Sequence, residues 1–216
     1  MMKVRGVLFD LYGTLVRLPV GKKDPMISLI DELKGKKEEP CLRTGFDSKT
    51  IRKIAMTERF ETLGEFVTRI TVDEFKLKEL DRYEEELTKQ IGEITVFPET
   101  IEVLRKLKER GLKLGIVSNL AYRYGEVITN LELGEFFDSI VLSYEVGAIK
   151  PEPQIYERAL ERLKLQSNEV FMTGDKNIND VIGPRQIGIR AKLLDREKVG
   201  GDEEKMASLM ELLDLI

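Results

Sequence analysis

The sequence predicts an α/β protein in which a parallel sheet carries helices on both faces and a small helical unit interrupts the chain just after the first strand. Two observations predict this fold class. Short apolar runs alternate with amphipathic stretches over most of the chain, and residues 17–92 break that alternation. A chain of 216 residues is long enough for one substantial core and one small additional unit.

The predicted strands are short apolar runs that end at polar or glycine-containing turns. The first, residues 4–9, ends at the turn Asp10-Leu-Tyr-Gly-Thr14 and therefore places Asp10 at its carboxyl end. Four further strands are expected at residues 112–117, 139–142, 170–172 and 189–194. Amphipathic helices are expected between them at residues 100–110, 122–133, 152–164 and 179–187.

The interrupting segment, residues 17–92, contains helical patterns and no convincing strand. Residues 34–43 within it are charged and contain glycine, so we expect a mobile loop there. The three expected helices run from Asp24-Pro25 to Gly35, from about Asp47 or Ser48 to Val67, and from Thr71, with Glu74 in capping-box spacing, to the residue before Gly92.

The composition excludes several classes of function. The 35 basic and 39 acidic residues are interspersed and give a net charge of −4, so the chain lacks the basic surface that nucleic-acid binding requires. It contains no histidine, which excludes a Ser-His-Asp triad, a histidine-ligated zinc and a histidine base. The single cysteine, Cys41, cannot form an internal disulfide, and no apolar stretch reaches the roughly 18 residues of a membrane span, so we expect a cytoplasmic protein without membrane contact.

Polar side chains with complementary chemistry follow the predicted strands. Because the carboxyl ends of parallel strands share one edge of a sheet, we expect these side chains to meet in one crevice. They are Asp10, Thr14, Ser118, Asn119, Lys150, Asp175 and Asp180.

This combination of side chains suits attack on a phosphoryl group. Asp10 supplies a nucleophile, Lys150 would neutralise the anion, and the hydroxyls of Ser118 and Thr14 would hold its oxygens. A hard divalent cation would bridge oxygens of Asp10 and Asp175.

These residues lie in four stretches, residues 10–15, 118–119, 147–153 and 174–180. In order and spacing the stretches resemble the motifs of the haloacid dehalogenase superfamily of hydrolases and phosphotransferases. The resemblance covers residues 4–195, whereas residues 17–92 match only in position and helical character. It implies a Rossmann-like core domain of residues 1–16 and 93–216. It also implies that residues 17–92 form a helical cap domain, which closes over the crevice and selects the substrate.

Roles for individual residues follow from the same resemblance. Asp10 would be the nucleophile, Ser118 and Lys150 would bind the anion, and Mg²⁺ would be the cofactor. Its ligands would include Asp10, Asp175 and the main-chain carbonyl of Tyr12, and Asp180 would support the metal directly or through water. We place Thr14 and Asn119 beside them as candidate catalytic residues.

One position departs from the pattern of the phosphatases. These enzymes usually have a second aspartate two residues after the nucleophile, which protonates the leaving alcohol, and this chain has Tyr12 there. The dehalogenase branch resembles the chain in this tyrosine, in Asn177 and in Tyr156. Halide departs without a proton, so a dehalogenase needs no such acid.

The fourth of these stretches, residues 174–180, favours a phosphatase. Dehalogenases of that branch work without metal and typically have a serine where this chain has Asp175, and the chain has no tryptophan for their substrate-holding pattern. Three carboxylates in one crevice would repel each other without a cation, and a bound magnesium ion removes that repulsion.

We therefore predict a Mg²⁺-dependent haloacid dehalogenase-like phosphatase that acts on a small phosphorylated metabolite through an aspartyl-phosphate on Asp10. One alternative is a 2-haloacid dehalogenase that forms an ester on the same residue without metal. Another is a weakly active or non-catalytic relative that binds a phosphorylated ligand. The sequence indicates neither the substrate nor the oligomeric state.

Overall fold

The computed structural model describes residues 3–35, 42–72, 77–197 and 204–216. Its centre is a six-stranded sheet in the order β5-β4-β1-β6-β7-β8, and every neighbouring pair is parallel. The structure thus confirms the predicted parallel sheet and adds β8, which the sequence did not indicate. The strands are β1 (Gly6–Phe9), β4 (Lys113–Ser118), β5 (Ser139–Leu142), β6 (Val170–Gly174), β7 (Arg190–Leu194) and β8 (Lys205–Met206).

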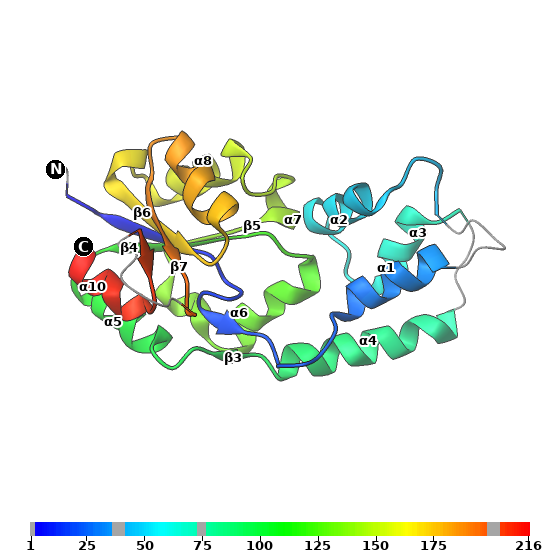
Figure 1. The fold of residues 1–216 in the computed structure, drawn as a ribbon. Coiled ribbons are helices and arrows are strands. Elements are labelled where there is room, and N and C mark those ends of the chain that lie inside the picture. Colours follow the sequence, from blue (N-terminus) through cyan, green and yellow to red (C-terminus); the bar gives the residue numbers. More distant parts are fainter. Residues whose placement is uncertain (1–2, 36–41, 73–76, 198–203) are drawn as a thin grey trace.

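Helices cover both faces of this sheet, as predicted (Figure 1). Helix α8 (Pro153–Leu163) packs on β4 and β5 from one side. Helices α5 (Thr100–Glu109), α6 (Glu126–Asn130) and α10 (Leu212–Leu215) lie on the other side. The short helix α7 (Ser143–Val146) follows β5, and the 3₁₀ turns η3 (Ser167–Glu169) and η5 (Leu209–Glu211) precede β6 and α10.

Four helices form a separate group at one end of the molecule (Figure 1). They are α1 (Pro25–Gly35), α2 (Ser48–Thr57), α3 (Leu63–Ile70) and α4 (Leu77–Gly92). Two short antiparallel strands, β2 (Val16–Arg17) and β3 (Thr95–Val96), close the segment at its base. This closure supports the proposed division into a core of residues 1–16 and 93–216 and a cap of residues 17–92. Arg17 lies in a strand, where we expected none.

The prediction of one continuous helix from about residue 47 to Val67 is wrong. Helix α2 ends because Glu58 adopts an extended conformation. Helix α3 begins after its N-cap residue Thr62, whose side chain accepts a hydrogen bond from the backbone N–H of Glu65. The predicted start at Thr71 is also wrong, because its N–H donates to the carbonyl of Val67 at the end of α3. Glu74, Cys41 and most of the predicted mobile loop lie outside the described residues.

Two predicted core helices are interrupted. The stretch 122–133 contains a 3₁₀ turn η1 (Tyr122–Gly125) and α6, and the left-handed residue Glu132 then separates α6 from the 3₁₀ turn η2 (Leu133–Phe136). The stretch 179–187 begins inside a π-helical turn η4 (Asn177–Ile182) and continues as α9 (Gly183–Gln186). Side-chain periodicity alone does not distinguish these tighter or wider turns from an α-helix.

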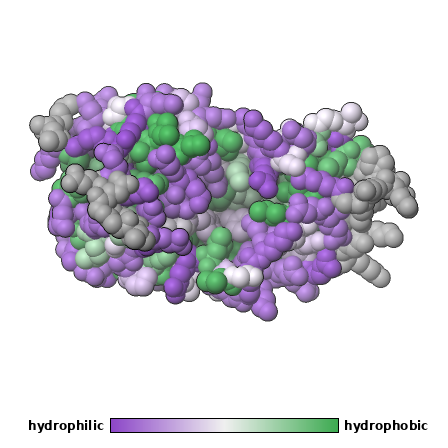
Figure 2. Space-filling view, viewed as in Figure 1, coloured by the Kyte–Doolittle hydropathy of each residue, from purple (hydrophilic) through white to green (hydrophobic). Residues whose placement is uncertain are grey.

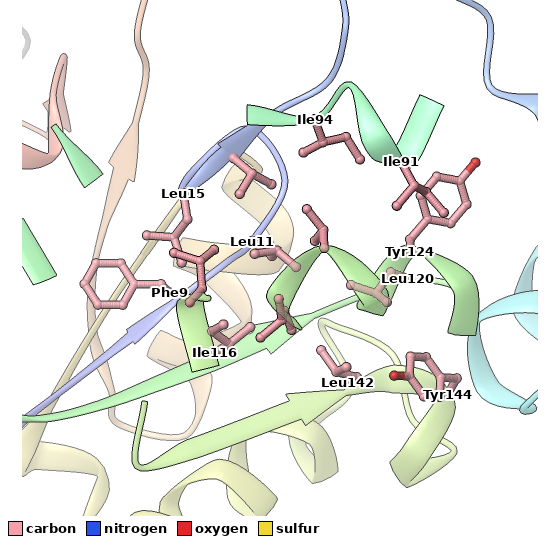
Figure 3. Close-up of a cluster of buried hydrophobic side chains, with 14 of the residues drawn as sticks. Phe9, Leu11, Leu15, Ile91, Ile94, Ile116, Leu120, Tyr124, Leu142 and Tyr144 are labelled. Atoms are coloured by element: carbon pink, nitrogen blue, oxygen red, sulfur yellow. The ribbon is translucent and has the colours of Figure 1, made fainter. Parts of the chain in front are cut away.

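The apolar core continues from the sheet to the base of the four-helix group (Figure 3). Phe9 and Leu11, the two neighbours of Asp10 in the chain, have no exposed surface. The backbone that carries Asp10 is therefore fixed by packing on both sides. The cluster includes Phe9, Leu11, Leu15, Ile91, Ile94, Ile116, Leu120, Tyr124, Leu142 and Tyr144. Across the described residues, every helix is too short or too polar to cross a lipid bilayer.

Candidate active site

A buried lysine joins two of the predicted carboxylates. The Nζ atom of Lys150 lies 2.7 Å from Oδ1 of Asp10 and 2.7 Å from Oδ1 of Asp180. Only 3% of Lys150 and 7% of Asp10 is exposed, and Asp180 has no exposed surface. These ion pairs are therefore shielded from bulk water, and charge interactions are stronger in this less polar environment than in water.

The pKa shifts of this group follow from burial and from the neighbouring charges. Burial alone would lower the pKa of Lys150, but the charges of Asp10 and Asp180 outweigh it and raise that pKa. Burial, together with the charge of Asp10, raises the pKa of Asp180 to about 6, although Lys150 opposes the shift. Lys150 is therefore a permanent cation at the carboxyl ends of β1 and β6.

Asp10, Asp175 and Asp180 form an acidic cluster, in which one carboxylate oxygen from each lies within 4.8 Å of the others. Oδ1 of Asp175 is buried and, among the described residues, has no hydrogen-bond partner, whereas Oδ2 pairs with Nζ of Lys176 at 2.7 Å. An unpartnered buried carboxylate oxygen is costly unless a ligand satisfies it. The all-oxygen donor set and this free oxygen fit Mg²⁺.

Two glycines permit this close approach of carboxylates to the backbone. A Cβ atom on Gly13, whose φ is +82°, would lie 2.6 Å from Oδ2 of Asp175. A Cβ atom on Gly174 would lie 2.3 Å from Oδ2 of Asp180. Any larger side chain at either position would displace the acidic cluster.

The structure brings one of the two predicted hydroxyl residues into contact with the acidic cluster. The hydroxyl of Ser118, at the end of β4, donates to Oδ1 of Asp10 over 3.1 Å. Thr14 is completely buried in the turn after β1, and its Oγ1 has no hydrogen-bond partner within the described part of the chain. The Ser118 hydroxyl therefore contacts the acidic cluster, and the Thr14 hydroxyl is buried without a partner among the described residues, four residues after Asp10.

The side-chain amide of Asn119 bonds the backbone of Lys150, so it is not free to bind a substrate. Its Nδ2 donates to the carbonyl of Lys150 over 2.9 Å, and its Oδ1 accepts from the backbone N–H of Lys150 over 2.7 Å. The side chain therefore holds the backbone of Lys150 and positions its ammonium group.

The hydroxyl of Tyr12 is engaged elsewhere and is not placed to act as an acid. Its hydroxyl donates to the carbonyl of Tyr124 over 2.9 Å, and the two rings meet edge to face at 6.1 Å. Burial, and then the charges of Asp24 and Glu126, raise its pKa well above the usual value. The Tyr12 hydroxyl is therefore a tethered neutral group.

The backbone of the turn after β1 is held by hydrogen bonds. The carbonyl of Leu11 accepts from Leu15 and Val16, and the N–H of Gly13 donates to the carbonyl of Val16. The carbonyl of Tyr12 takes part in none of these bonds, which leaves it available to a ligand.

Tyr156 and Asn177 are the other two residues that resemble the dehalogenase branch. The hydroxyl of Tyr156 donates to the carbonyl of Asn179 over 2.5 Å and so supports the turn that carries Asp180. Asn177 is exposed.

Arg196 is a residue of the site that sequence reasoning missed. Its Nη2 donates to the carbonyl of Thr14 over 2.7 Å, and its Nε lies 3.5 Å from the carbonyl of Gly13. The guanidinium also pairs with Glu99 and lies 3.5 Å above the ring of Phe97. It holds the turn that follows the candidate nucleophile. Nothing in the spacing after the last predicted strand indicates this contact.

Comparison with known proteins identifies the family of the chain. The sequence pattern of the haloacid dehalogenase-like hydrolases matches residues 7–193. A pyrophosphatase PpaX from Bacillus cereus is 31% identical over 192 residues, which make up 88% of this chain and 82% of the relative. The crystal structure of a HAD phosphatase from Thermococcus onnurineus superposes with a TM-score of 0.67 at 26% identity, covering 99% of this chain and 97% of the other.

Further relatives align over a shorter region. A glyceraldehyde 3-phosphate phosphatase from Methanothermobacter thermautotrophicus is 36% identical over 102 residues, which are 47% of this chain and 45% of the relative. The chain spans about half the length of the curated glyceraldehyde 3-phosphate phosphatases that it matches. The match over most of the chain confirms the resemblance: the protein belongs to the family of haloacid dehalogenase-like hydrolases.

Proposed function

We propose that the chain is a Mg²⁺-dependent phosphatase that hydrolyses a phosphate ester of a small metabolite through an aspartyl-phosphate on Asp10. The observation that carries the proposal is the acidic cluster of Asp10, Asp175 and Asp180, with an unpartnered oxygen of Asp175, beside the buried cation of Lys150. The relatives that are named phosphatases support it. The composition, with its single cysteine, supports a cytoplasmic location.

The metal would be held by Asp10, Asp175 and the carbonyl of Tyr12, with Asp180 as a direct or water-mediated support. Bound there, Mg²⁺ supplies positive charge that offsets the carboxylates and the phosphate oxygens. Among the described residues, buried Lys150 and exposed Lys176 are the cations paired with the three carboxylates, which leaves the cluster with a net negative charge that repels an anionic substrate until further positive charge is supplied.

The chain's own residues account for the transfer. Lys150, Ser118 and Thr14 orient the phosphoryl group, and a carboxylate oxygen of Asp10 attacks phosphorus. The new bond joins Asp10 to phosphorus, and the bond from phosphorus to the ester oxygen breaks. Water then attacks phosphorus, the bond to Asp10 breaks, and phosphate leaves with the original carboxylate restored.

The leaving oxygen receives its proton from water in this scheme. Tyr12 occupies the position of the usual acid, and its hydroxyl is tied to the carbonyl of Tyr124. Esters whose alcohol is a good leaving group should therefore be favoured.

Tyr12 favours the dehalogenase alternative, whereas the hydroxyl of Tyr156 is engaged with the carbonyl of Asn179 and Asn177 is exposed. A dehalogenase that works without metal does not need Asp175 as a metal ligand. The third candidate, a ligand-binding relative without turnover, is also suggested by Tyr12, because that residue replaces the usual acid.

A panel of phosphate esters and 2-haloacids, each assayed with Mg²⁺ and with a chelator, separates the three. We expect phosphate release from aryl and acyl phosphates that requires Mg²⁺ and is absent in Asp10→Asn. Halide release that persists with chelator would establish the dehalogenase. Binding of phosphate esters without release of either product would establish the non-catalytic relative.

A further inference from the structure

A cavity of about 240 Å³ lies between the four-helix group and the carboxyl end of β4. Its walls come from α1, α2, the residues after β4 and the turn η1, so the proposed cap and core both contribute. Apolar side chains are visible in the region between these two parts in the space-filling view (Figure 2). The apolar lining includes Met26, Ile27, Ile30, Ala55, Met56 and Leu120.

Two residues that line this cavity are close in sequence to the candidate nucleophile and its hydroxyl partner. Tyr12 and Asn119 line it, and they lie two residues after Asp10 and one residue after Ser118. The hydroxyl of Ser118 lies 3.1 Å from Oδ1 of Asp10. The organic part of a phosphate ester bound at Asp10 would therefore have this space available to it.

Most polar groups in the wall already have partners. The Tyr12 hydroxyl donates to a carbonyl, the Asn119 amide holds the backbone of Lys150, and Oδ1 of Asp24 accepts from the first N–H groups of α1. The hydroxyl of Tyr124 is buried without a partner among the described residues, and Arg52 stands at the exposed side.

Beyond the Tyr124 hydroxyl and Arg52, the polar groups named here already have partners, so a group rich in hydroxyls is a poor occupant. Each hydroxyl that leaves water for this wall without a partner weakens binding by about tenfold. Apolar atoms incur no such penalty and gain from leaving water.

The volume indicates how large a group the walls can surround. A dry cavity of about 150 Å³ holds one benzene molecule, so a cavity of 240 Å³ holds a six-membered ring with a short substituent, or about eight carbon atoms.

We propose that this cavity receives the leaving group of the substrate, and that this group is an apolar ring or chain of about eight carbon atoms. The proposal rests on the proposed phosphatase function. It departs from the substrates for which the relatives are named, glyceraldehyde 3-phosphate and pyrophosphate, neither of which carries an apolar group.

Binding of non-hydrolysable n-alkylphosphonates to the full chain in Mg²⁺ buffer tests the cavity without turnover. We expect the Kd, measured by calorimetry, to fall about threefold to fourfold for each methylene from ethyl to about octyl. It should then level off at decyl, because the cavity is full. An equal Kd for ethylphosphonate and octylphosphonate would overturn the inference.

Two variants of α2 test the location. Ala55→Leu fills the cavity and should weaken the binding of octylphosphonate about tenfold more than that of ethylphosphonate. Met56→Ala enlarges the cavity, so the fall in Kd with chain length should continue to decylphosphonate. Lys49→Ala, an exposed residue of the same helix outside the lining, is the matched control and should keep the wild-type series. Variants that leave the chain-length series unchanged while circular dichroism shows a native fold would also overturn it.

Hydrolysis of ethyl phosphate and phenyl phosphate by the same protein separates this inference from the proposed function. Hydrolysis without any chain-length gain in binding would overturn the inference alone. A chain-length gain without hydrolysis of any phosphate ester would overturn the proposed function.

Discussion

Asp10 is held between two completely buried neighbours and pairs with Lys150, so a change of one atom in its carboxylate can be tested without moving the backbone. Asp10→Asn should lower kcat for phenyl phosphate about 10³-fold or more, because the amide is isosteric but not nucleophilic. Stopped assays of phosphate release measure this loss. Asp31→Asn, the same change at an exposed aspartate, should keep wild-type turnover. Activity of Asp10→Asn within tenfold of wild type would contradict the assignment.

Tyr12 permits a second test at the scale of one residue. Tyr12→Phe removes one hydrogen bond, to the carbonyl of Tyr124, and should lower the free energy of unfolding by about 1 kcal/mol. Because the hydroxyl donates no proton to the leaving group, the variant should change aryl and alkyl phosphate rates by the same factor. Aryl esters should exceed alkyl esters by ~10²- to 10⁴-fold in both proteins. A selective loss on alkyl esters would identify Tyr12 as the proton donor.

The elements that sequence patterns predicted well are those with one dominant signal. The strands β1, β4 and β5 are short apolar runs, and α8 begins with Pro153, so their positions agree with prediction. The break between α2 and α3 contains neither glycine nor proline and was missed, although the Thr62 to Glu65 spacing carries a capping signal. The strand β8 has two residues and pairs with β7, which lies more than ten residues earlier in the chain, so no local pattern indicates it.

Asp138 stabilises the junction between β4 and β5, and we expect its contribution to the free energy of unfolding to depend on pH. Its Oδ2 accepts from the N–H of Leu114 at 2.8 Å and from Lys108 at 3.0 Å. Burial opposes ionisation, but these two partners outweigh it and lower the pKa of Asp138. The folded pKa thus lies below the unfolded value of about 3.9, so the stabilisation is present above that pH and is lost as pH falls through the folded pKa.

Asp138→Asn should therefore lower the free energy of unfolding by about 1 kcal/mol at pH 7, a modest value because the side chain is 37% exposed. Urea unfolding between pH 7 and pH 3 should show the difference from wild type shrinking below about pH 4. Asp214→Asn, at an exposed position of α10, is the control and should show no such trend. A difference that stays constant over this pH range would contradict the role of the Asp138 charge.

At the scale of the whole molecule, the sequence predicted where the candidate site lies but not what surrounds it. Asp10, Ser118, Lys150 and Asp180 meet because parallel strands end at one edge of the sheet. The cavity depends instead on how the four-helix group packs on the core. Contacts such as Lys53 with Glu152 join residues far apart in sequence, and no periodicity indicates them.

The acidic cluster links the proposed metal to the stability of the whole molecule. Since Mg²⁺ would bind the folded cluster and not the unfolded chain, a concentration of 100 times Kd should stabilise the protein by about 2.7 kcal/mol, which raises Tm by roughly 5–10 °C at this length. Scanning calorimetry with MgCl₂, against NaCl of equal ionic strength, measures the shift. Asp175→Asn should remove most of it, because it alters the carboxylate with the unpartnered oxygen, while Asp31→Asn should retain it. An equal shift in NaCl, or a full shift in Asp175→Asn, would show that this cluster does not bind the metal.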